Sequence, residues 1–523
     1  MNHQTLDTTE PRRNVSEAGV IETESRLVAQ ARPGSQERGG VVHALAVAAA
    51  LVALNTACTL EADTEYVCSL VGEGTHNGTN ATSNHQQDLT LYGTDLGFSF
   101  RHRRHVVMLF GDTWAEEDAI CKPPPVSDDS LGWIDLEKDH DPDDCLDLRF
   151  PTDEDGVFRP IQVLENGVPL PMGAFRTPIT GFSDRTSIYG YFAGDAVLCS
   201  PQAQPPCPEG FSCVAGLCVD PTSSVAPAGP VAAVAVERHI AHSQNPTAPE
   251  VFTVGHTFAT NKFANATARA IWSLDESKPW RNVYAAGKRP RELLVWGRPG
   301  FVAPLAATAD LYLLHHPLAT LDGPGDDVNW QPRYFAGLTA KGKPTWTSNQ
   351  LLAAPVIAGE EIAGVLQFSI AWVPGIHRFV MLYAGRLPRA LSLPGTGIQM
   401  RTARNPWGPW SEPELIWNAL DEGAYACPDG YMYAWWAVGA QCPQSDAYRP
   451  DWLPNEGLNQ CPNPSPTPNL DIGVEYGVNI LATFSKPGPR FGTATIYWNL
   501  STWNPYHVVL MKTHLDGTQI AAP

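Results

Sequence analysis

The stretch that decides the fold is DLTLYGTDLGFSFRHRRHVVMLFGDTW, residues 88–114. Two runs of alternating apolar and polar residues flank a charged segment, and a period of two is typical of β-strands. The sequence therefore predicts a β-hairpin. A turn centred between Arg103 and Arg104 places Asp95 directly opposite Asp112, with their Cβ atoms ~5 Å apart on one face of the sheet.

This carboxylate pair is the strongest functional signal in the chain. Like charges directly opposite each other destabilise a sheet, so the pairing predicts a site where a positive ligand or a shared proton offsets the repulsion. Glycines stand beside both aspartates, at Gly93, Gly97 and Gly111, and would let a substrate approach the backbone closely. The alternative is that each aspartate merely caps a turn.

Alternating runs of the same kind recur along the chain, separated by Gly, Pro, Asn or Asp. Examples are ELLVWG (292–297), HRFVMLYAG (377–385) and TATIYWNLS (493–501). About twenty such runs, with no helical periodicity beyond ten residues, indicate an all-β fold. This number of strands suits a five-bladed β-propeller of four strands per blade, and a pair of two-sheet sandwiches is the alternative.

Three insertions interrupt the strand pattern, at about 116–157, 197–220 and 421–465. Residues 128–155 are rich in aspartate and offer oxygen ligands for a structural Ca²⁺, although a solvated acidic loop is the alternative, since no complete calcium-loop motif is present. The other two insertions combine cysteines with Pro, Gly and Asn, which predicts loops stapled by disulfides.

The cysteines and one apolar stretch predict export. Residues 41–57 have the length of a secretory signal and are too short for a membrane span of ~20 residues. They end at Cys58, which predicts a lipoprotein-type signal with Cys58 lipidated; export with cleavage near Ala57 and no lipid is the alternative. Of the 11 cysteines, ten then remain for five disulfides, with those at 199–218 pairing mostly among themselves.

The domain plan follows from these features. Residues 1–40 are polar and are interpreted as disordered or as lying before the true start, and 58–84 as a linker. The propeller is expected over 85–516, followed by a tail at 517–523. We expect a lipid-anchored protein of the bacterial cell envelope, or an extracellular one if the anchor is absent.

Charge and missing motifs narrow the function class. The formal net charge is −20 and the pI is about 5.1, which disfavours nucleic acid and leaves a lipid anchor as the contact with a membrane. The sequence lacks a phosphate-binding glycine loop, a Gly-x-Ser-x-Gly elbow and a nicotinamide fingerprint. We therefore expect hydrolysis without an organic cofactor or catalytic metal, by a monomer.

Several motifs resemble one known family. GTDLG (93–97) followed by FGDTW (110–114) closely resembles the opening of the domain-of-unknown-function 4185 family (DUF4185), whose characterised members form glycoside hydrolase family 183, endo-acting D-arabinanases. YGVNILATFS (476–485) and YWNLSTWNPYHVVLMKTHL (497–515) resemble its closing strands. The resemblance spans about residues 85–516, although the acidic and cysteine-rich insertions depart from simpler members.

The resemblance implies a five-bladed propeller with an axial active site, in which Asp95 and Asp112 are the catalytic carboxylates. Cleaving a furanoside requires one protonated carboxyl at the leaving oxygen and one ionised carboxylate that activates water or attacks carbon. We expect inversion, because many related propellers invert. The candidate substrate-binding residues around this pair are Thr94, Thr113, Trp114, Arg176 and Asp184.

The leading hypothesis is thus an exported glycoside hydrolase that cleaves furanosidic polysaccharide, most directly D-arabinan in endo mode. The alternative is a non-catalytic surface propeller lipoprotein that binds glycan, because propellers serve as scaffolds as well as enzymes. The presence of both Asp95 and Asp112 favours the enzyme.

Overall fold

A computed structural model describes part of the chain, and the chain divides into two compact units, residues 1–57 and 58–523. All described residues belong to the second unit. They are 60–71, 91, 93–114, 128–138, 141–170, 177–196, 212–214, 217–219, 236–243, 249–259, 261–263, 265–272, 274, 289–298, 310–320, 332–359, 367–385, 397–424, 431–432, 474–503 and 507–517.

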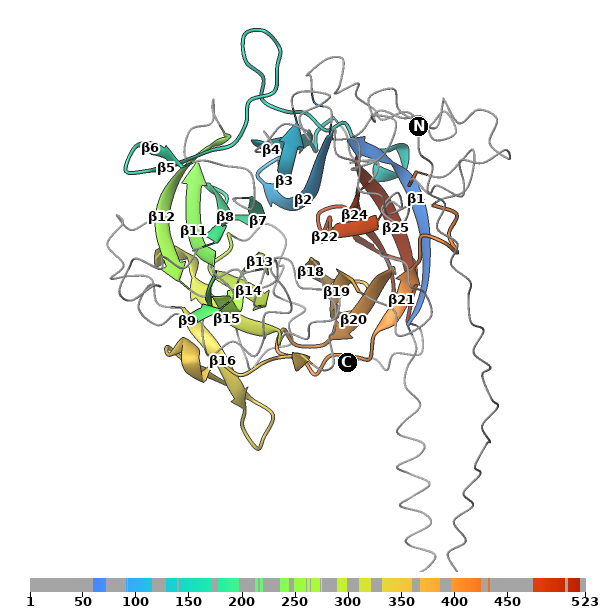
Figure 1. The fold of residues 1–523 in the computed structure, drawn as a ribbon. Helices are drawn as coiled ribbons and strands as arrows, with labels where there is room; N and C mark the ends of the chain where they lie inside the picture. Colours follow the sequence, from blue (N-terminus) through green and yellow to red (C-terminus); the bar gives the residue numbers. More distant parts are fainter. Residues whose placement is uncertain are drawn as a thin grey trace, which may run out of the picture. The chain divides into compact units, whose positions relative to one another are not determined.

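Five inner strands form a closed ring. Each contacts the next along the chain, and the fifth contacts the first. The predicted five-bladed β-propeller is therefore confirmed (Figure 1). The inner strands, in chain order, are β2 (Gly93–His102), β7 (Pro178–Ser183), β13 (Asn265–Ile271), β18 (Phe368–Val373) and β22 (Val474–Ile480).

Each inner strand begins one blade. Blade 1 continues with β3 (His105–Trp114) and β4 (Asp128–Asp135). Blade 2 adds β8 (Ile188–Ala196), β11 (Val236–Ser243) and β12 (Val251–Ala259), with β5 (Gln162–Glu165) parallel to β12 and β6 (Val168–Leu170) outermost. Blade 3 adds β14 (Glu292–Arg298), β15 (Tyr312–Pro317), β16 (Arg333–Leu338) and β17 (Pro344–Thr347).

The last two blades complete the ring. Blade 4 adds β19 (Arg378–Ala384), β20 (Ile398–Ala403) and β21 (Glu414–Trp417). Blade 5 adds β24 (Thr493–Trp503), β25 (His507–Asp516) and β1 (Glu61–Val71), with β23 (Lys486–Pro487) beside β24. Four 3₁₀ turns are also described: η2 (Pro142–Asp144), η3 (Asn261–Phe263), η5 (Leu318–Thr320) and η7 (Gln350–Leu352).

The hydrophobic core lies between the blades. Five clusters of buried apolar residues each join two neighbouring blades, because the strands of one blade pack face to face on those of the next. One residue pair represents each interface, from the pair of blades 1 and 2 round to that of blades 5 and 1: Leu109 and Phe192, Tyr189 and Leu293, Trp296 and Phe379, Val380 and Trp498, Leu510 and Phe110.

The interpretation of 58–84 as a linker is wrong where the structure describes it. Strand β1 pairs antiparallel with β25 from Glu61↔Asp516 onward and forms the outer strand of blade 5. Its first six residues alternate between exposed and half-buried, which is a strand signal in the sequence itself. The N-terminal strand therefore closes the ring by completing the last blade.

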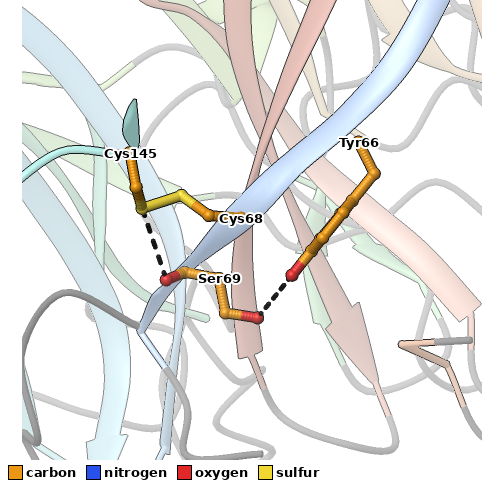
Figure 2. Close-up of a disulfide and its surroundings, with 4 residues drawn as sticks. All are labelled: Tyr66, Cys68, Ser69 and Cys145. Atoms are coloured by element: carbon orange, nitrogen blue, oxygen red, sulfur yellow. Dashed lines mark hydrogen bonds between the residues drawn. A yellow bond between two sulfur atoms is a disulfide. The ribbon is translucent and has the colours of Figure 1, made fainter. Parts of the chain in front are cut away.

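A disulfide fixes this closure. Cys68 on β1 is bonded to Cys145, which directly follows η2 in the segment after blade 1 (Figure 2). Both cysteines are buried. The bond agrees with the expectation of an oxidised exported protein, whereas the pairing of the other cysteines, and the lipidation of Cys58, lie outside the described side chains.

The insertions are more ordered than expected where they are described. Strand β4 lies inside 116–157, so this acidic segment supplies the third strand of blade 1 as well as a loop. In 197–220, β9 (Ser212–Val214) and β10 (Leu217–Val219) form a small hairpin with Cys213 opposite Cys218. Of 421–465, only 421–424 and 431–432 are described.

The predicted signal at 41–57 and the extension at 1–40 lie outside the described residues. Among the residues that are described, no helix is long and apolar enough to cross a membrane.

Candidate active site

The candidate site lies where the inner strands begin, which we call the axial rim. Tyr476, near the start of β22, donates a hydrogen bond to Oδ2 of Asp95 near the start of β2 (2.9 Å). The N–H of Gly477 donates to Oε1 of Gln367, just before β18 (3.1 Å). The starts of these inner strands therefore meet at one end of the propeller, and Asp95 lies among them.

The predicted hairpin forms, but its register differs at the site. The turn lies between Arg103 and Arg104, with His102 paired to His105. Further along, Asp95 pairs with Gly111 instead of Asp112, so the predicted direct opposition of the two aspartates is wrong. Two bulges cause the shift, one at Gly97 on β2 and one at residues 112–113 on β3.

The absence of a side chain at Gly111 makes room for Asp95. A Cβ atom built on Gly111 would lie 2.7 Å from Oδ1 of Asp95 and would also clash with the hydroxyl of Thr177. Any other residue there would displace the carboxylate. The glycine beside the aspartate thus has the steric role expected from the sequence, although it faces Asp95 rather than Asp112.

Blade 5 fixes the bulge that precedes the site. Leu96 and Gly97 both have positive φ angles, 68° and 77°. The N–H of Leu96 donates to Oγ of Ser501 (2.7 Å), and Nδ2 of Asn499 donates to the carbonyl of Leu96 (2.7 Å). Nδ2 of Asn479 donates to the carbonyl of Gly97 (3.1 Å). Because these partners satisfy the displaced backbone groups, the bulge is stable and Asp95 is held at the rim.

Asp112 occupies the bulge of β3. It is half-buried and has a φ of 38°, a left-handed conformation that is uncommon for a residue with a side chain. The pairing of β3 with β4 also skips this point, passing from Phe110↔Ser130 to Thr113↔Asp128. Bulges commonly redirect a side chain next to an active site, and this one redirects Asp112.

A third carboxyl completes the cluster. Asp129 on β4 is fully buried, and its Oδ1 accepts a hydrogen bond from the N–H of Asp112 (3.1 Å). Burial raises the pKa of Asp129 well above 3.8, and the charges of Asp112 and Asp95 raise it further, against the hydrogen bonds from Thr177 and the Asp112 N–H. The pKa of Asp129 thus shows that all three carboxyls interact. The sequence analysis missed Asp129 because it treated 116–157 as a loop.

The predicted threonines join the strands of blade 1. Oγ1 of Thr94 donates to the carbonyl of Gly111 (3.0 Å) and lies 2.7 Å from Oγ1 of Thr113, which lies 2.7 Å from Oγ of Ser130. All three hydroxyls are buried. Their contacts hold β2, β3 and β4 together beneath the aspartates. Trp114 is also buried, at 7% exposure, so protein atoms cover most of its ring.

Asp184 lies at the opposite end of its strand from the rim, and Arg176 is outside the described residues. The carboxylate of Asp184 accepts hydrogen bonds from the N–H groups of Thr186 and Ser187 and pairs with Arg289. Burial acts to raise the pKa of Asp184, but these hydrogen bonds together lower it. The structure therefore does not bring Asp184 together with Asp95, and it gives Asp184 a turn-stabilising role.

An arginine closes the axis below the site. Arg269 on β13 is buried and donates through Nε to the carbonyl of Ile370 (2.7 Å) and through Nη2 to Oγ of Ser369 (3.0 Å). Weaker contacts at 3.5 Å reach the carbonyls of Ser99 and Ile480. Its guanidinium thus bridges the inner strands of blades 1, 4 and 5 from blade 3. A ligand that reaches Asp95 must therefore approach from the axial rim and not through the axis.

The aspartate-rich segment uses at least one acid in a protein contact. Asp143 in η2 accepts hydrogen bonds from Tyr497 (2.7 Å) and Lys512 (3.0 Å), which belong to blade 5. In the part of the chain that the structure describes, no group of three or more His, Cys, Asp or Glu side chains is arranged to hold a metal ion. The suggestion of a structural Ca²⁺ at 128–155 stays a sequence-based prediction.

Glu475 is a second buried acid at the rim, next to Tyr476. Its Oε1 accepts a hydrogen bond from the N–H of Gly397, which precedes β20. Burial raises the pKa of Glu475 from 4.5 to about 7, against the hydrogen bond from Gly397. Because the folded pKa exceeds the unfolded one, Glu475 favours folding at low pH, and this contribution is lost as the pH rises from about 4.5 to about 7.

Replacing Glu475 with Gln should raise the melting temperature at pH 8 and leave it unchanged at pH 4. The amide oxygen keeps the bond to Gly397, while the cost of ionising a buried carboxyl, about 3 kcal/mol for a shift of this size, disappears. Thermal melts from pH 4 to pH 8 measure the difference, with Glu412→Gln on an exposed glutamate as the control. A difference that does not change with pH would show that Glu475 titrates normally.

Comparison with protein-family models finds no match, and no curated protein matches the chain. Similar solved structures include an exo-beta-1,3-galactanase from Phanerochaete chrysosporium, at 9% identity and TM-score 0.33, covering 86% of this chain and 64% of that one. An N-acetylgalactosamine deacetylase from F. plautii has 10% identity and TM-score 0.37, covering 87% and 94%. A GH62 alpha-L-arabinofuranosidase from Coprinopsis cinerea has 7% identity and TM-score 0.33, covering 88% and 98%. Similarity at this level assigns no activity to this chain.

Proposed function

We propose that this protein is an exported glycoside hydrolase that cleaves a furanosidic polysaccharide, acting on D-arabinan in endo mode. The observation that carries the proposal is the carboxyl cluster at the axial rim, where Asp95, Asp112 and Asp129 interact at a pair of β-bulges. The choice of D-arabinan rests on the resemblance of GTDLG and FGDTW to the DUF4185 family.

The hydrogen bonds support a division of roles between the two catalytic aspartates. Tyr476 donates its hydroxyl hydrogen to Asp95, and a donated hydrogen bond stabilises the ionised form of a carboxyl. Asp95 is therefore proposed as the carboxylate that activates water or attacks the anomeric carbon. Asp112, half-buried in the bulge, is proposed as the acid that protonates the leaving oxygen.

The arrangement also suits a neutral substrate better than an anionic one. The three carboxyls lie together in a protein of formal net charge −20. A polyanionic glycan would be repelled on approach, whereas a neutral arabinan would not. Because Arg269 closes the axis, the chain of sugars is expected to lie across the rim rather than thread through the propeller.

Purified protein should release oligosaccharides from D-arabinan and new reducing ends should accumulate with time. A panel of D-arabinan, L-arabinan, galactan and fructan, read by reducing-end assay and chromatography, tests both the reaction and the sugar. Cleavage of another furanoside would keep the hydrolase and change its substrate. Binding to a glycan of the panel without cleavage of any would instead favour the non-catalytic glycan-binding propeller.

A further inference from the structure

Asp129 holds the backbone of Asp112 at the point where the sheet cannot. The β3 bulge interrupts the ladder with β4 between Phe110 and Thr113, so the N–H of Asp112 makes no ladder bond to β4. Oδ1 of Asp129 accepts this N–H at 3.1 Å. A side chain thus replaces the missing backbone partner at the residue proposed as the catalytic acid.

The surroundings of Asp129 disfavour a charge on it. Its side chain is fully buried, and Oδ2 accepts no hydrogen bond within normal distance and angle limits from the described residues. The groups that act on it are the carboxylates of Asp112 on β3 and Asp95 on β2, together with the hydroxyl of Thr177 before β7. An ionised Asp129 would be a third negative charge in a desolvated cluster, which is strongly unfavourable.

We propose that Asp129 is a positioning residue, which in its protonated form holds the backbone of Asp112 in the left-handed bulge. This inference rests on the proposed function, because it assigns a role relative to Asp112 as the acid. A neutral carboxyl keeps its carbonyl oxygen as an acceptor for the Asp112 N–H and adds no negative charge beside Asp95 and Asp112. The direction of the shift in the pKa of Asp129 agrees with this protonated form.

The proposal predicts that Asn can replace Asp129 and Ala cannot. In Asp129→Asn, the amide oxygen accepts the same N–H without charge, so kcat at the pH optimum should stay within about threefold of wild type. In Asp129→Ala, Asp112 loses its backbone partner, and kcat should fall by about 10²-fold, the effect of misplacing a catalytic group by ~1 Å. KM should change little in either, because Asp129 is buried and is not expected to touch substrate.

The matched control is Asp128→Asn, on the neighbouring residue of β4. Asp128 is half-buried, pairs with Thr113 through the backbone, and should tolerate the change with unaltered kcat. If Asp129→Asn loses as much activity as Asp129→Ala, the ionised carboxylate is needed and the proposal is wrong. If both variants keep wild-type kcat, Asp129 does not position Asp112 and the proposal is equally wrong.

A measurement without substrate separates this proposal from the proposed function. Because the pKa of Asp129 is higher in the folded protein than its ordinary value of 3.8, wild type should lose stability relative to Asp129→Asn as the pH rises above about 4. Melting temperatures of the two proteins should therefore diverge with rising pH. If wild type cleaves no glycan but the curves diverge, the function fails and the protonated Asp129 stands. A constant difference contradicts the protonated state.

Discussion

Asn in place of either Asp95 or Asp112 should lower kcat on the cleaved glycan by about 10²- to 10⁴-fold and leave the fold intact. The amide is nearly the same size as the carboxyl and still accepts one hydrogen bond, so Tyr476 keeps its partner in Asp95→Asn. What disappears is the ability to ionise or to donate a proton, which the hydrolysis of a glycosidic bond requires.

The two variants should differ in how they fail. Asp95→Asn removes the proposed base or nucleophile and should remain inactive on all substrates. Asp112→Asn removes the proposed acid and should regain part of its rate on an arabinoside with a leaving group of low pKa, such as a nitrophenolate, which needs no protonation. Initial rates on the polysaccharide and on the activated arabinoside, with matching melting curves, measure the difference.

The outcome that contradicts this assignment is simple. A folded Asp95→Asn or Asp112→Asn protein with near-wild-type kcat would show that the changed residue is not an essential acid or base. The assignment would then move to Asp129, the other carboxyl of the cluster. Asp184 is a poor substitute, because it lies at the other end of its strand and is bonded to Arg289.

Removing the Cys68–Cys145 disulfide should lower the free energy of unfolding by about 4 kcal/mol. The bond joins residues 77 apart in the sequence, and closing a loop of this length in the unfolded chain accounts for a cost of that size. The effect should be concentrated at ring closure, because Cys68 lies on the strand that completes blade 5 and Cys145 lies after blade 1 (Figure 2). Denaturant titration of Cys68→Ala/Cys145→Ala measures it.

A neighbouring change on the same strand provides the control. Tyr66→Phe removes the hydroxyl that lies 3.2 Å from Oγ of Ser69 but keeps the disulfide, and should cost only about 1 kcal/mol. Adding a reductant to wild type should reproduce the double variant. If neither the reductant nor the double substitution changes the midpoint, the bond contributes nothing to the stability of the ring.

The sequence predicted the hairpin of blade 1 correctly as far as local information reaches. Its turn at Arg103 and Arg104 and its pairing near the turn follow from alternation in a single stretch. The register at Asp95 does not, because the bulge at Leu96 and Gly97 is held by Asn499 and Ser501, about 400 residues further along the chain. Local periodicity carries no signal of such distant partners.

Two other errors have related causes. Strand β1 was interpreted as part of a linker because its partner, β25, lies at the far end of the sequence, although its own alternation was visible. Strand β4 was hidden in an acidic segment, where the run DDSLGWID (128–135) begins and ends with charge. Asp129 was missed with it, because an acid is interpreted as solvated unless its strand, and hence its burial, is known.

The pairing of β1 with β25 also sets the order in which the protein can fold. Glu61 pairs with Asp516, so the first strand to be synthesised waits for about 450 further residues before its partner exists. At ~5 to 20 residues per second, translation keeps that edge unpaired for roughly 20 to 90 s. An unpaired strand edge is prone to join other chains. The three acidic residues of β1, Glu61, Asp63 and Glu65, alternate along its exposed face and would repel a second copy during that interval.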